Sequence, residues 1–336
     1  MNRPRTRSAA GLLLSAVLAV AASRSSPAAE TVVTVIAEGG GDFRTIQAAV
    51  DSIPDRNTNA CVILVAPGRY AERVTVSRGR RFVTLRGMGR LAADVVIAGG
   101  TGRWGVVSVS ADDFRAEKLT LENTAGPSAG AQMALFCDGK RQVFEDLVIK
   151  GWQDTLGSWN GNVAYFRNCE IRGSVDFIYS GGTALFDRCD IVQIRELGGP
   201  VAAPSTPKDV TYGLVFLNCR VKKLPAVAAN SSTLMRPWRP DGQTAFINCV
   251  MDDHITAKGW SEWDGRENTC RAVEYGSRKP DGTAIDLSKR APWAKILTAA
   301  EAAQYTVTNV LGGWNPAREV AKPLMRGLGG SRSGRI

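Results

Sequence analysis

Two aspartates, Asp154 in "WQDTL" and Asp176 in "VDFIY", have the residue type and the spacing that chemistry needs. They lie 22 positions apart, and Phe144 and Phe166 are separated by the same interval. If the chain repeats at that interval, the two carboxyl groups lie on neighbouring turns, roughly 4.8 Å apart like adjacent strands. Like charges so close resist joint ionisation, so one group keeps its proton while the other, paired with a cation, stays charged. A general acid and a nucleophile need this division.

Amides and a cation are available beside the two acids. Gln132 precedes Asp154 by the same 22 positions and is expected to extend the column by one turn, and Gln153 adds a second amide. Arg236 in "TLMRPW" is the candidate cation, because a guanidinium can hold a carboxylate in a bidentate geometry. The structural alternative is that the polar groups only satisfy one another, or that each aspartate caps a turn.

The sequence lacks the residues that serine hydrolases and zinc sites require. His254 is the single histidine and follows "NCVMDD", where we expect a structural or surface role. The sequence contains no GxSxG elbow, no HExxH motif and no zinc-like spacing of Cys and His.

The elements that position these residues recur along the chain. Six segments share a phrase that begins with phenylalanine and continues with alternating apolar and polar residues, as in strands with one face inward. They begin at Phe114, Phe144, Phe166, Phe186, Phe216 and Phe246. Periods of this size with short strands are typical of a solenoid, so the sequence predicts an all-β, single-domain parallel β-helix. A two-sheet sandwich is the alternative, which the unequal repeats and missing hairpin turns disfavour.

Both ends of the solenoid are expected to be capped. Residues 42–54, "DFRTIQAAVDSIP", have the apolar spacing of a helix that Pro54 ends, and this helix would cover the exposed strand edges at one end. From about Trp260 the phrase disappears, which predicts a C-terminal cap of helix and loop. We expect the folded domain to span residues 30–325 and residues 326–336 to form a flexible tail.

The remaining composition points to an exported protein. Residues 1–29 carry arginines, a short apolar run and small residues, which is typical of a signal peptide. Its removal takes four arginines away and reduces the net charge from +10 to +6, an excess that favours an acidic polymer as partner. We expect a secreted or periplasmic monomer without a membrane span, and dispersed Lys and Arg speak against a nucleic-acid partner. With seven cysteines and no CxxC pair, at least one buried free thiol is expected.

Several longer motifs occur in a definite order. They are "GGGDFRTIQAAVDSIP", "APGRYAERVTV", "LRGMG", "AQMALFCDG", "WQDTL", "GSVDFIY", "LMRPW" and "NVLGGWNP". Together they resemble the pectin methylesterases (pectinesterases), a family of carbohydrate esterases. The resemblance covers most of the chain after the signal peptide and implies that the parallel β-helix is right-handed.

The resemblance also implies a role for each polar residue. Asp176 corresponds to the family's nucleophile and Asp154 to its general acid and base. Gln132 and Gln153 correspond to the amides that stabilise the oxyanion, and Arg236 to the arginine that holds the nucleophile. The implied reaction is hydrolysis of galacturonate methyl esters in pectin, without a metal or an organic cofactor.

Aromatic residues near the column are candidates for substrate contacts, because their faces can stack on sugars. Trp238 matches the family's substrate-contacting tryptophan. We expect Trp152, Phe177 and Tyr179 to line the same cleft, and Trp159, Trp260 and Trp263 also lie near enough in the sequence to contribute.

Three departures from the family pattern bear on the shape of the cleft. Gly157 stands where a tyrosine usually follows QDTL, Met235 replaces the glycine of LGRPW, and Tyr179-Ser180 replaces Phe-Gly after DFI. Alternatives from the residues alone are a retaining glycosidase, a calcium-dependent pectate lyase, a polysaccharide binder without turnover, or an esterase for another small ester.

Overall fold

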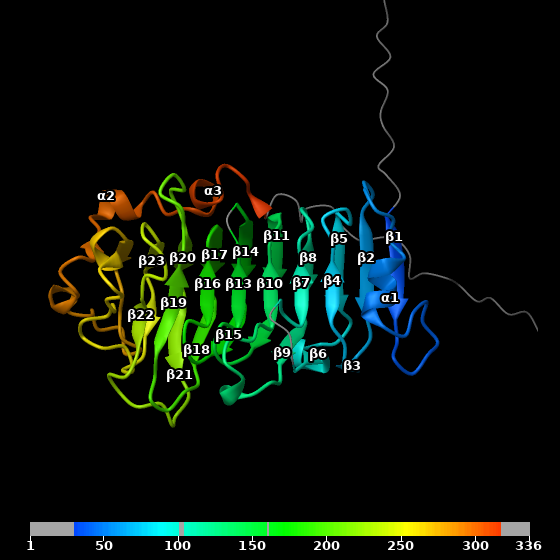
Figure 1. Ribbon diagram of the computed structural model, residues 1–336, viewed down its shortest axis with the longest axis horizontal. Helices are drawn as coiled ribbons and strands as arrows, with labels where there is room; N and C mark the ends of the chain where they lie inside the picture. The colour runs from blue at the N-terminus through cyan, green and yellow to red at the C-terminus, as the bar shows by residue number, and fades with distance from the viewer. Residues whose placement is uncertain (1–29, 101–103, 160, 317–336) are drawn as a thin grey trace, which may run out of the picture.

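The computed structural model of the chain describes residues 30–100, 104–159 and 161–316. In these residues the chain coils into a parallel β-helix built from three parallel sheets, as predicted (Figure 1). Successive turns add one strand to each sheet, so that residues about twenty to thirty positions apart lie side by side. The signal peptide expected at residues 1–29 and the tail expected at residues 326–336 lie outside the described residues.

Within the described residues, sheet A has 11 strands, sheet B has eight and sheet C has seven. Sheet A contains β1 (Thr31–Val35), β2 (Cys61–Val65), β5 (Val83–Gly87), β8 (Arg115–Glu117), β11 (Lys140–Glu145), β14 (Val163–Arg167), β17 (Thr183–Asp187), β20 (Leu214–Leu217), β23 (Gln243–Ile247), β25 (Arg271–Tyr275) and β26 (Lys295–Ile296). Sheet B contains β3 (Gly68–Tyr70), β6 (Val95–Gly99), β9 (Thr120–Asn123), β12 (Val148–Lys150), β15 (Glu170–Gly173), β18 (Asp190–Gln193), β21 (Arg220–Lys223) and β24 (Val250–Met251). Sheet C contains β4 (Val74–Val76), β7 (Val107–Val109), β10 (Leu135–Cys137), β13 (Leu156–Ser158), β16 (Ile178–Ser180), β19 (Pro200–Pro204) and β22 (Thr233–Met235).

The repeated phenylalanines form a stack inside the helix. Phe144, Phe166, Phe186, Phe216 and Phe246 occupy one register of sheet A, and their neighbouring ring centroids lie 4.4–4.8 Å apart. All five side chains are fully buried, so stacking on the next turn is how each turn shields its apolar face from water.

The first repeat was aligned wrongly from the sequence. Phe144 pairs with Ala116 rather than with Phe114, so the phrase at Phe114 is displaced by two residues. The ring of Phe114 still reaches that of Phe144, at 6.1 Å and tilted by 49°. Thirty positions therefore separate the two phenylalanines without their sharing a register.

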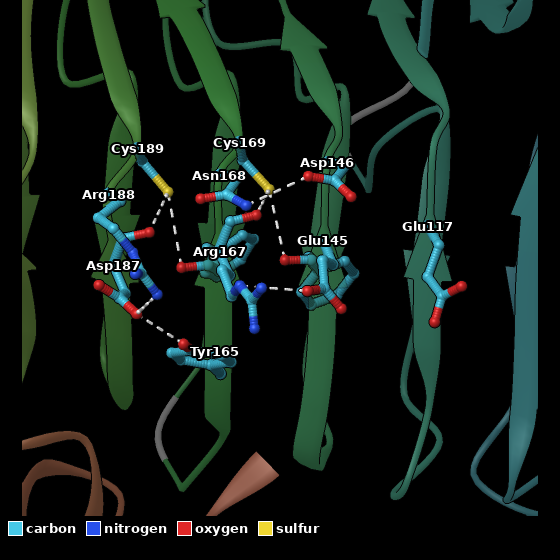
Figure 2. A network of polar contacts seen from close by, with 12 residues as sticks. Glu117, Glu145, Asp146, Tyr165, Arg167, Asn168, Cys169, Asp187, Arg188 and Cys189 are labelled. Atoms are coloured by element: carbon cyan, nitrogen blue, oxygen red, sulfur yellow. Dashed lines mark hydrogen bonds and ion pairs between the residues drawn. The ribbon is translucent and has the colours of Figure 1, made fainter. Parts of the chain in front are cut away.

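A tight bend follows each stacked phenylalanine and turns the chain from sheet A into sheet B. The residue at the bend has a positive φ, as at Asn168 (51°) and Arg188 (55°), and the next residue is a cysteine in four of the turns. Figure 2 shows two of these thiols, with Cys169 donating to the Phe144 carbonyl and Cys189 to the Phe166 carbonyl at 3.4 and 3.5 Å. All seven cysteines are free thiols, which confirms the expectation of buried free cysteine.

The outer face of sheet A carries polar side chains that bridge neighbouring strands. In Figure 2 the Tyr165 hydroxyl donates to Asp187 Oδ2 at 2.7 Å, and Arg188 pairs with the same oxygen at 3.0 Å. Arg167 pairs with Glu145 on the adjoining strand at 3.2 Å. The contacts of Tyr165 with Asp187 and of Arg167 with Glu145 join neighbouring turns of the β-helix.

The N-terminal helix is shorter than its motif but acts as the expected cap. Helix α1 (Ile46–Asp51) begins after Thr45, whose side chain accepts from the Ala48 amide, and buries Ile46, Ala49 and Val50 against the first turns. Figure 1 shows α1 at the end of the solenoid where β1 and β2 lie.

The C-terminal region differs in part from the expected cap. Strands β25 and β26 continue sheet A beyond the last repeated phrase, because backbone pairing does not require the phenylalanine: Glu274 of β25 takes the position opposite Phe246. Helices α2 (Ala299–Ala302) and α3 (Val307–Val310) then follow, and α3 lies back along the outside of sheet A near β17 (Figure 1). Val310 and Leu311 are buried there with Leu185 and Val215. In the part of the chain that the structure describes, no helix is both long and apolar enough to cross a membrane.

Candidate active site

Asp154 and Asp176 lie at equivalent places on consecutive turns. Each stands two residues before a strand of sheet C, and the pairing of Leu156 with Ile178 puts the two aspartates in one register. Both have left-handed backbone angles, φ 57° at Asp154 and φ 49° at Asp176, a conformation that Asp tolerates better than most residues. The repeat therefore brings the two carboxyl groups together as predicted.

The two glutamines form a row of their own beside the aspartates. Strand β10 pairs with β13 through Leu135 and Leu156, an offset of 21, so Gln132 lies opposite Gln153 and not opposite Asp154. The backbone amide of Gln132 donates to the backbone carbonyl of Gln153 at 3.2 Å. The expectation that Gln132 continues the aspartate column was wrong by one residue, because this turn is one residue shorter than the next.

Arg236 reaches Asp176 from two turns further along the helix. It follows β22 directly, and its Nε donates to Asp176 Oδ1 at 2.8 Å while its Nη2 donates to Oδ2 at 2.5 Å. The guanidinium also lies over the ring of Trp263, 4.1 Å from the centroid. Only 8% of the Asp176 side chain is exposed, so this bidentate pair supplies the charge compensation that a buried carboxylate requires.

The carboxyl groups open into a cavity of about 400 Å³ on sheet C. The polar lining is Gln153, Asp154, Asp176 and Arg236, and the rest is mainly aromatic. The apolar lining comprises Trp104, Ala131, Met133, Trp159, Tyr179, Ala203, Trp238 and Trp263. A few convergent polar groups in a mainly apolar hollow are typical of a site for a small molecule or a segment of a polymer.

The surroundings of Asp154 and Asp176 shift the pKa values of the two carboxyl groups differently. Burial, and next the charge of Asp176, raise the pKa of Asp154 to about 7, with Arg236 opposing. Burial also raises the pKa of Asp176, but the hydrogen bonds and charge of Arg236 hold it down. Near neutral pH, Asp154 can therefore donate a proton while Asp176 is the better candidate for the ionised partner.

Tyr179 occupies the space that a side chain at position 157 would need. A Cβ atom on Gly157 would lie 2.5 Å from Tyr179 Cζ and 2.6 Å from its hydroxyl oxygen. The Tyr179 hydroxyl donates to Met133 Sδ at 3.1 Å, and the ring meets those of Trp159 and Trp238 edge-on. The aromatic group absent at position 157 is thus supplied by the following turn.

Two of the residues that depart from the family pattern, Met235 and Ser180, lie away from the cavity. Met235 is fully buried in the interior of the helix, and the Ser180 hydroxyl lies 2.5 Å from that of Ser158, also in the interior. Among the departing residues, Gly157 and Tyr179 together shape the cavity.

Some of the aromatic residues expected at the site line the cavity and others do not. Trp238 and Tyr179 line the cavity, whereas Phe177 is fully buried, in the same core cluster as Ile178, and cannot touch a substrate. Trp152 is half-buried and does not line the cavity, so that expectation was also wrong.

Sequence reasoning missed Trp104 as a site residue. Its side chain is 48% exposed, and its ring lies 6.1 Å from that of Trp159, which is also partly exposed. Trp104 stands before β7, three turns before Asp176 along sheet C, and no repeat motif marks it. Trp104 is identified by the structure, in which it and Trp159 are large, partly exposed aromatic side chains beside the polar groups of the cavity.

Comparison with known proteins agrees with this geometry. The family model described as Pectinesterase matches residues 32–314. Pectinesterase QRT1 of Arabidopsis thaliana is 34% identical, with 80% of this chain and 74% of the relative covered. Pectinesterase A of Dickeya chrysanthemi is 33% identical, with 91% and 98% covered. The chain spans about half the length of two further Arabidopsis relatives, pectinesterases 5 and 4, at 52% and 53%.

A solved structure shows the same architecture. A pectin methylesterase in complex with a hexasaccharide aligns with a TM-score of 0.72 at 30% identity, covering 87% of this chain and 99% of that one. The order of motifs, the parallel β-helix, the paired aspartates and these matches agree. The chain belongs to the pectinesterase family of carboxylic-ester hydrolases.

Proposed function

We propose that this protein hydrolyses the methyl esters of galacturonate residues in pectin, releasing methanol and pectate through an acyl-enzyme on Asp176. The observation that carries the proposal is the asymmetry of the acid pair: Arg236 binds the carboxylate of Asp176, while burial raises the pKa of Asp154 to about 7. One group is thus poised as a nucleophile and the other as a proton donor.

In the first half of the reaction, a carboxylate oxygen of Asp176 attacks the carbonyl carbon of the methyl ester. Negative charge develops on the carbonyl oxygen, and the side-chain amides of Gln153 and Gln132 donate hydrogen bonds to it. As the bond to the methoxy oxygen breaks, Asp154 gives its proton to that oxygen. Methanol leaves, and a mixed anhydride joins the sugar to Asp176.

In the second half, water attacks the anhydride and the Asp154 carboxylate takes its proton. The bond to Asp176 breaks, which frees the sugar as a carboxylic acid that loses its proton to water, and both aspartates return to their starting states. The alternating role of Asp154 needs a pKa near the working pH, and its value of about 7 supplies this.

The substrate and location follow from the cavity and the sequence. Trp104, Trp159 and Trp238 give the cavity a row of aromatic surfaces suited to the apolar faces of sugar rings, and the related enzyme solved with a hexasaccharide supports a polymeric substrate. We propose that the protein is exported through residues 1–29 and acts as a monomer on methyl-esterified pectin outside the cytoplasm.

Product analysis tests the proposal. The mature protein is incubated with highly methylated pectin, and methanol, absorbance from unsaturated sugar ends and polymer length are followed together. We expect methanol without unsaturated ends and without shortening. Unsaturated ends would instead identify a lyase, shortening a glycosidase, and binding without methanol a non-catalytic protein.

A further inference from the structure

Thr155 is a polar residue at a place where the neighbouring turns carry apolar ones. The strand pairings of sheet C, extended by one residue, place it in a column with Ala134, Phe177 and Val201. All four side chains are fully buried. A buried hydroxyl in an apolar column is unfavourable unless it is hydrogen-bonded, and a repeat departs from its own pattern most often where function requires it. This departure falls directly after Asp154.

The Thr155 hydroxyl joins the backbone of two consecutive turns. It lies 3.1 Å from the carbonyl oxygen of Trp152 and 3.1 Å from that of Arg172, so its proton is shared between them. Trp152 is three residues earlier in the same turn, and this contact closes the bend at Asp154. Arg172 belongs to the next turn, four residues before Asp176. The hydroxyl therefore ties the segment that carries one acid to the segment that leads to the other.

Two glycines leave room for the hydroxyl between the turns. A Cβ on Gly151 would lie 2.7 Å from Thr155 Oγ1, and a Cβ on Gly173 would lie 2.8 Å from the same atom. Beside this contact, the Asp154 amide donates to the Val175 carbonyl at 3.2 Å. A side-chain contact and a backbone contact thus hold the two turns together at the base of the acid pair.

The proposed reaction depends on the separation of the two carboxyl groups. Asp154 must give its proton to the methoxy oxygen while Asp176 is bonded to the carbonyl carbon, so a small displacement of either acid slows the transfer. The charges that act on Asp154 are those of Asp176 and Arg236. A bend that loosened would admit water to Asp154 and move it away from Asp176, and both changes would lower the pKa of Asp154.

We propose that Thr155 is a positioning residue, whose buried hydroxyl fixes the bend of Asp154 against the turn of Asp176 and so sets the separation of the acid and the nucleophile. This inference rests on the proposed function and adds a residue to it. Thr155 is fully buried and does not line the cavity, so it acts through Asp154 and not on the substrate.

The test compares two substitutions that remove different parts of the side chain. Thr155→Val keeps the volume and removes the hydroxyl, whereas Thr155→Ser keeps the hydroxyl and removes the methyl group. Thr155→Val should fold, because the Trp152 carbonyl still accepts from the Ser174 amide at 2.9 Å. The Arg172 carbonyl likewise still accepts from the Gly151 amide at 3.1 Å.

Thr120→Val is the matched control. Thr120 is also buried, and its hydroxyl donates to the Ala92 carbonyl at 2.9 Å in a part of the helix outside the cavity. That carbonyl also keeps a backbone donor, the Val95 amide, when the hydroxyl is removed. The control therefore reproduces the loss of one buried hydroxyl without touching the turns of the acid pair.

Methanol release from methylated pectin is measured for all four proteins. We expect kcat of Thr155→Val to fall about 10- to 100-fold with KM within about twofold of the wild-type value. The kcat of Thr155→Ser should stay within about threefold of the wild type, because the hydrogen bonds remain, and Thr120→Val should match the wild type. The decline of kcat/KM above neutral pH should begin at lower pH in Thr155→Val than in Thr120→Val. Activity that is lower in Thr155→Ser than in Thr155→Val would show a packing role and overturn the inference.

Titration of the Asp154 carboxyl separates this inference from the proposed function. Its carbon-13 resonance, assigned by comparison with Asp154→Asn, needs no turnover, and we expect its pKa to be lower in Thr155→Val than in Thr120→Val. If the wild type releases no methanol but this difference is present, the esterase proposal fails and the positioning of Asp154 by Thr155 stands. Equal titration and equal kcat in Thr155→Val and Thr120→Val, with an active wild type, overturn the inference and leave the esterase proposal intact.

Discussion

Arg236 holds Asp176 through two nitrogens, with Nε 2.8 Å from Oδ1 and Nη2 2.5 Å from Oδ2, across two turns of the helix. The contact fixes the direction of the carboxylate and offsets the cost of burying its charge. The nucleophile of the proposed reaction thus depends on a residue 60 positions away in the sequence.

Replacing Arg236 by Gln should protonate the nucleophile. Without the guanidinium, burial raises the pKa of Asp176 further, and we expect kcat/KM at neutral pH to fall about 10²- to 10³-fold, with the acidic limb of the pH profile displaced upward. The kcat/KM of Arg236→Lys should lie between those of the wild type and Arg236→Gln, because one ammonium supplies the charge but cannot replace a bidentate contact.

The control for this change is Arg188→Gln. Arg188 pairs with Asp187 on the outer face of sheet A, away from the cavity, and its loss should leave the pH profile unchanged. An acidic limb in Arg236→Gln that coincides with that of the wild type would refute the role assigned to Arg236.

The pH dependence above neutrality should report Asp154. Since the pKa of Asp154 is raised to about 7, its proton is present below that pH and is lost above it, so kcat/KM should decline as pH rises through about 7. Asp154→Asn cannot exchange a proton and should lose at least about 10²-fold in activity at every pH. A wild-type rate that keeps rising from pH 7 to 9 would contradict the assignment of Asp154 as the acid.

The fit between Gly157 and Tyr179 should appear as a coupling in stability. Gly157→Ala places a Cβ 2.5 Å from the Tyr179 ring and should lower the free energy of unfolding by about 1–3 kcal/mol. In a Tyr179→Ala background the same change should cost less, with a coupling of at least about 1 kcal/mol. Denaturant unfolding of the four proteins of this cycle measures the coupling, and additive effects would show that the two residues do not compete for space.

Stability should fall in acid because of His254. It is fully buried, neither ring nitrogen has a hydrogen-bond partner among the described residues, and burial lowers its pKa to about 4, against opposing charges of Asp252 and Asp253. Between pH 6.5 and about 4 the unfolded chain binds a proton that the folded chain excludes. The stability this residue supplies is complete above pH 6.5, and about 3 kcal/mol of it is lost as pH falls to 4.

A variant without a titrating group isolates the effect of His254. His254→Gln should have a smaller decline in unfolding free energy between pH 6.5 and 4 than the wild type, whatever its stability at pH 7. Parallel declines in the two proteins would show that His254 does not titrate on unfolding.

The sequence predicted the fold because the repeat is local and visible. Phe166, Phe186, Phe216 and Phe246 each begin a similar phrase, and stacking requires that such residues share a register. The equal spacing of the two aspartates and two phenylalanines was sufficient to place Asp154 beside Asp176. Register was the source of error elsewhere, since a turn shorter by one or two residues displaced Gln132 and Phe114 without any mark in the sequence.

Features that depend on side-chain volume across turns could not be predicted. The Tyr179 ring fills the space that a side chain at Gly157 would need, and predicting this requires knowing which atoms of neighbouring turns are in contact. The exposure of Trp104 likewise depends on the shape of the cavity. Phe177 was misplaced for a related reason, because after the bend at Asp176 both Phe177 and Ile178 enter the core, which no pattern in the sequence marks.

The central claim, that Asp176 is the nucleophile, is tested most directly by methanol release from methylated pectin by Asp176→Asn beside Asp146→Asn. Asp146 has the same left-handed backbone conformation at a bend outside the cavity, φ 54° against 49°, so it matches the change in chemistry and in backbone setting. We expect Asp146→Asn to keep activity close to that of the wild type and Asp176→Asn, folded by circular dichroism, to lose at least about 10⁴-fold. Methanol release by folded Asp176→Asn at a rate near that of Asp146→Asn would contradict the account.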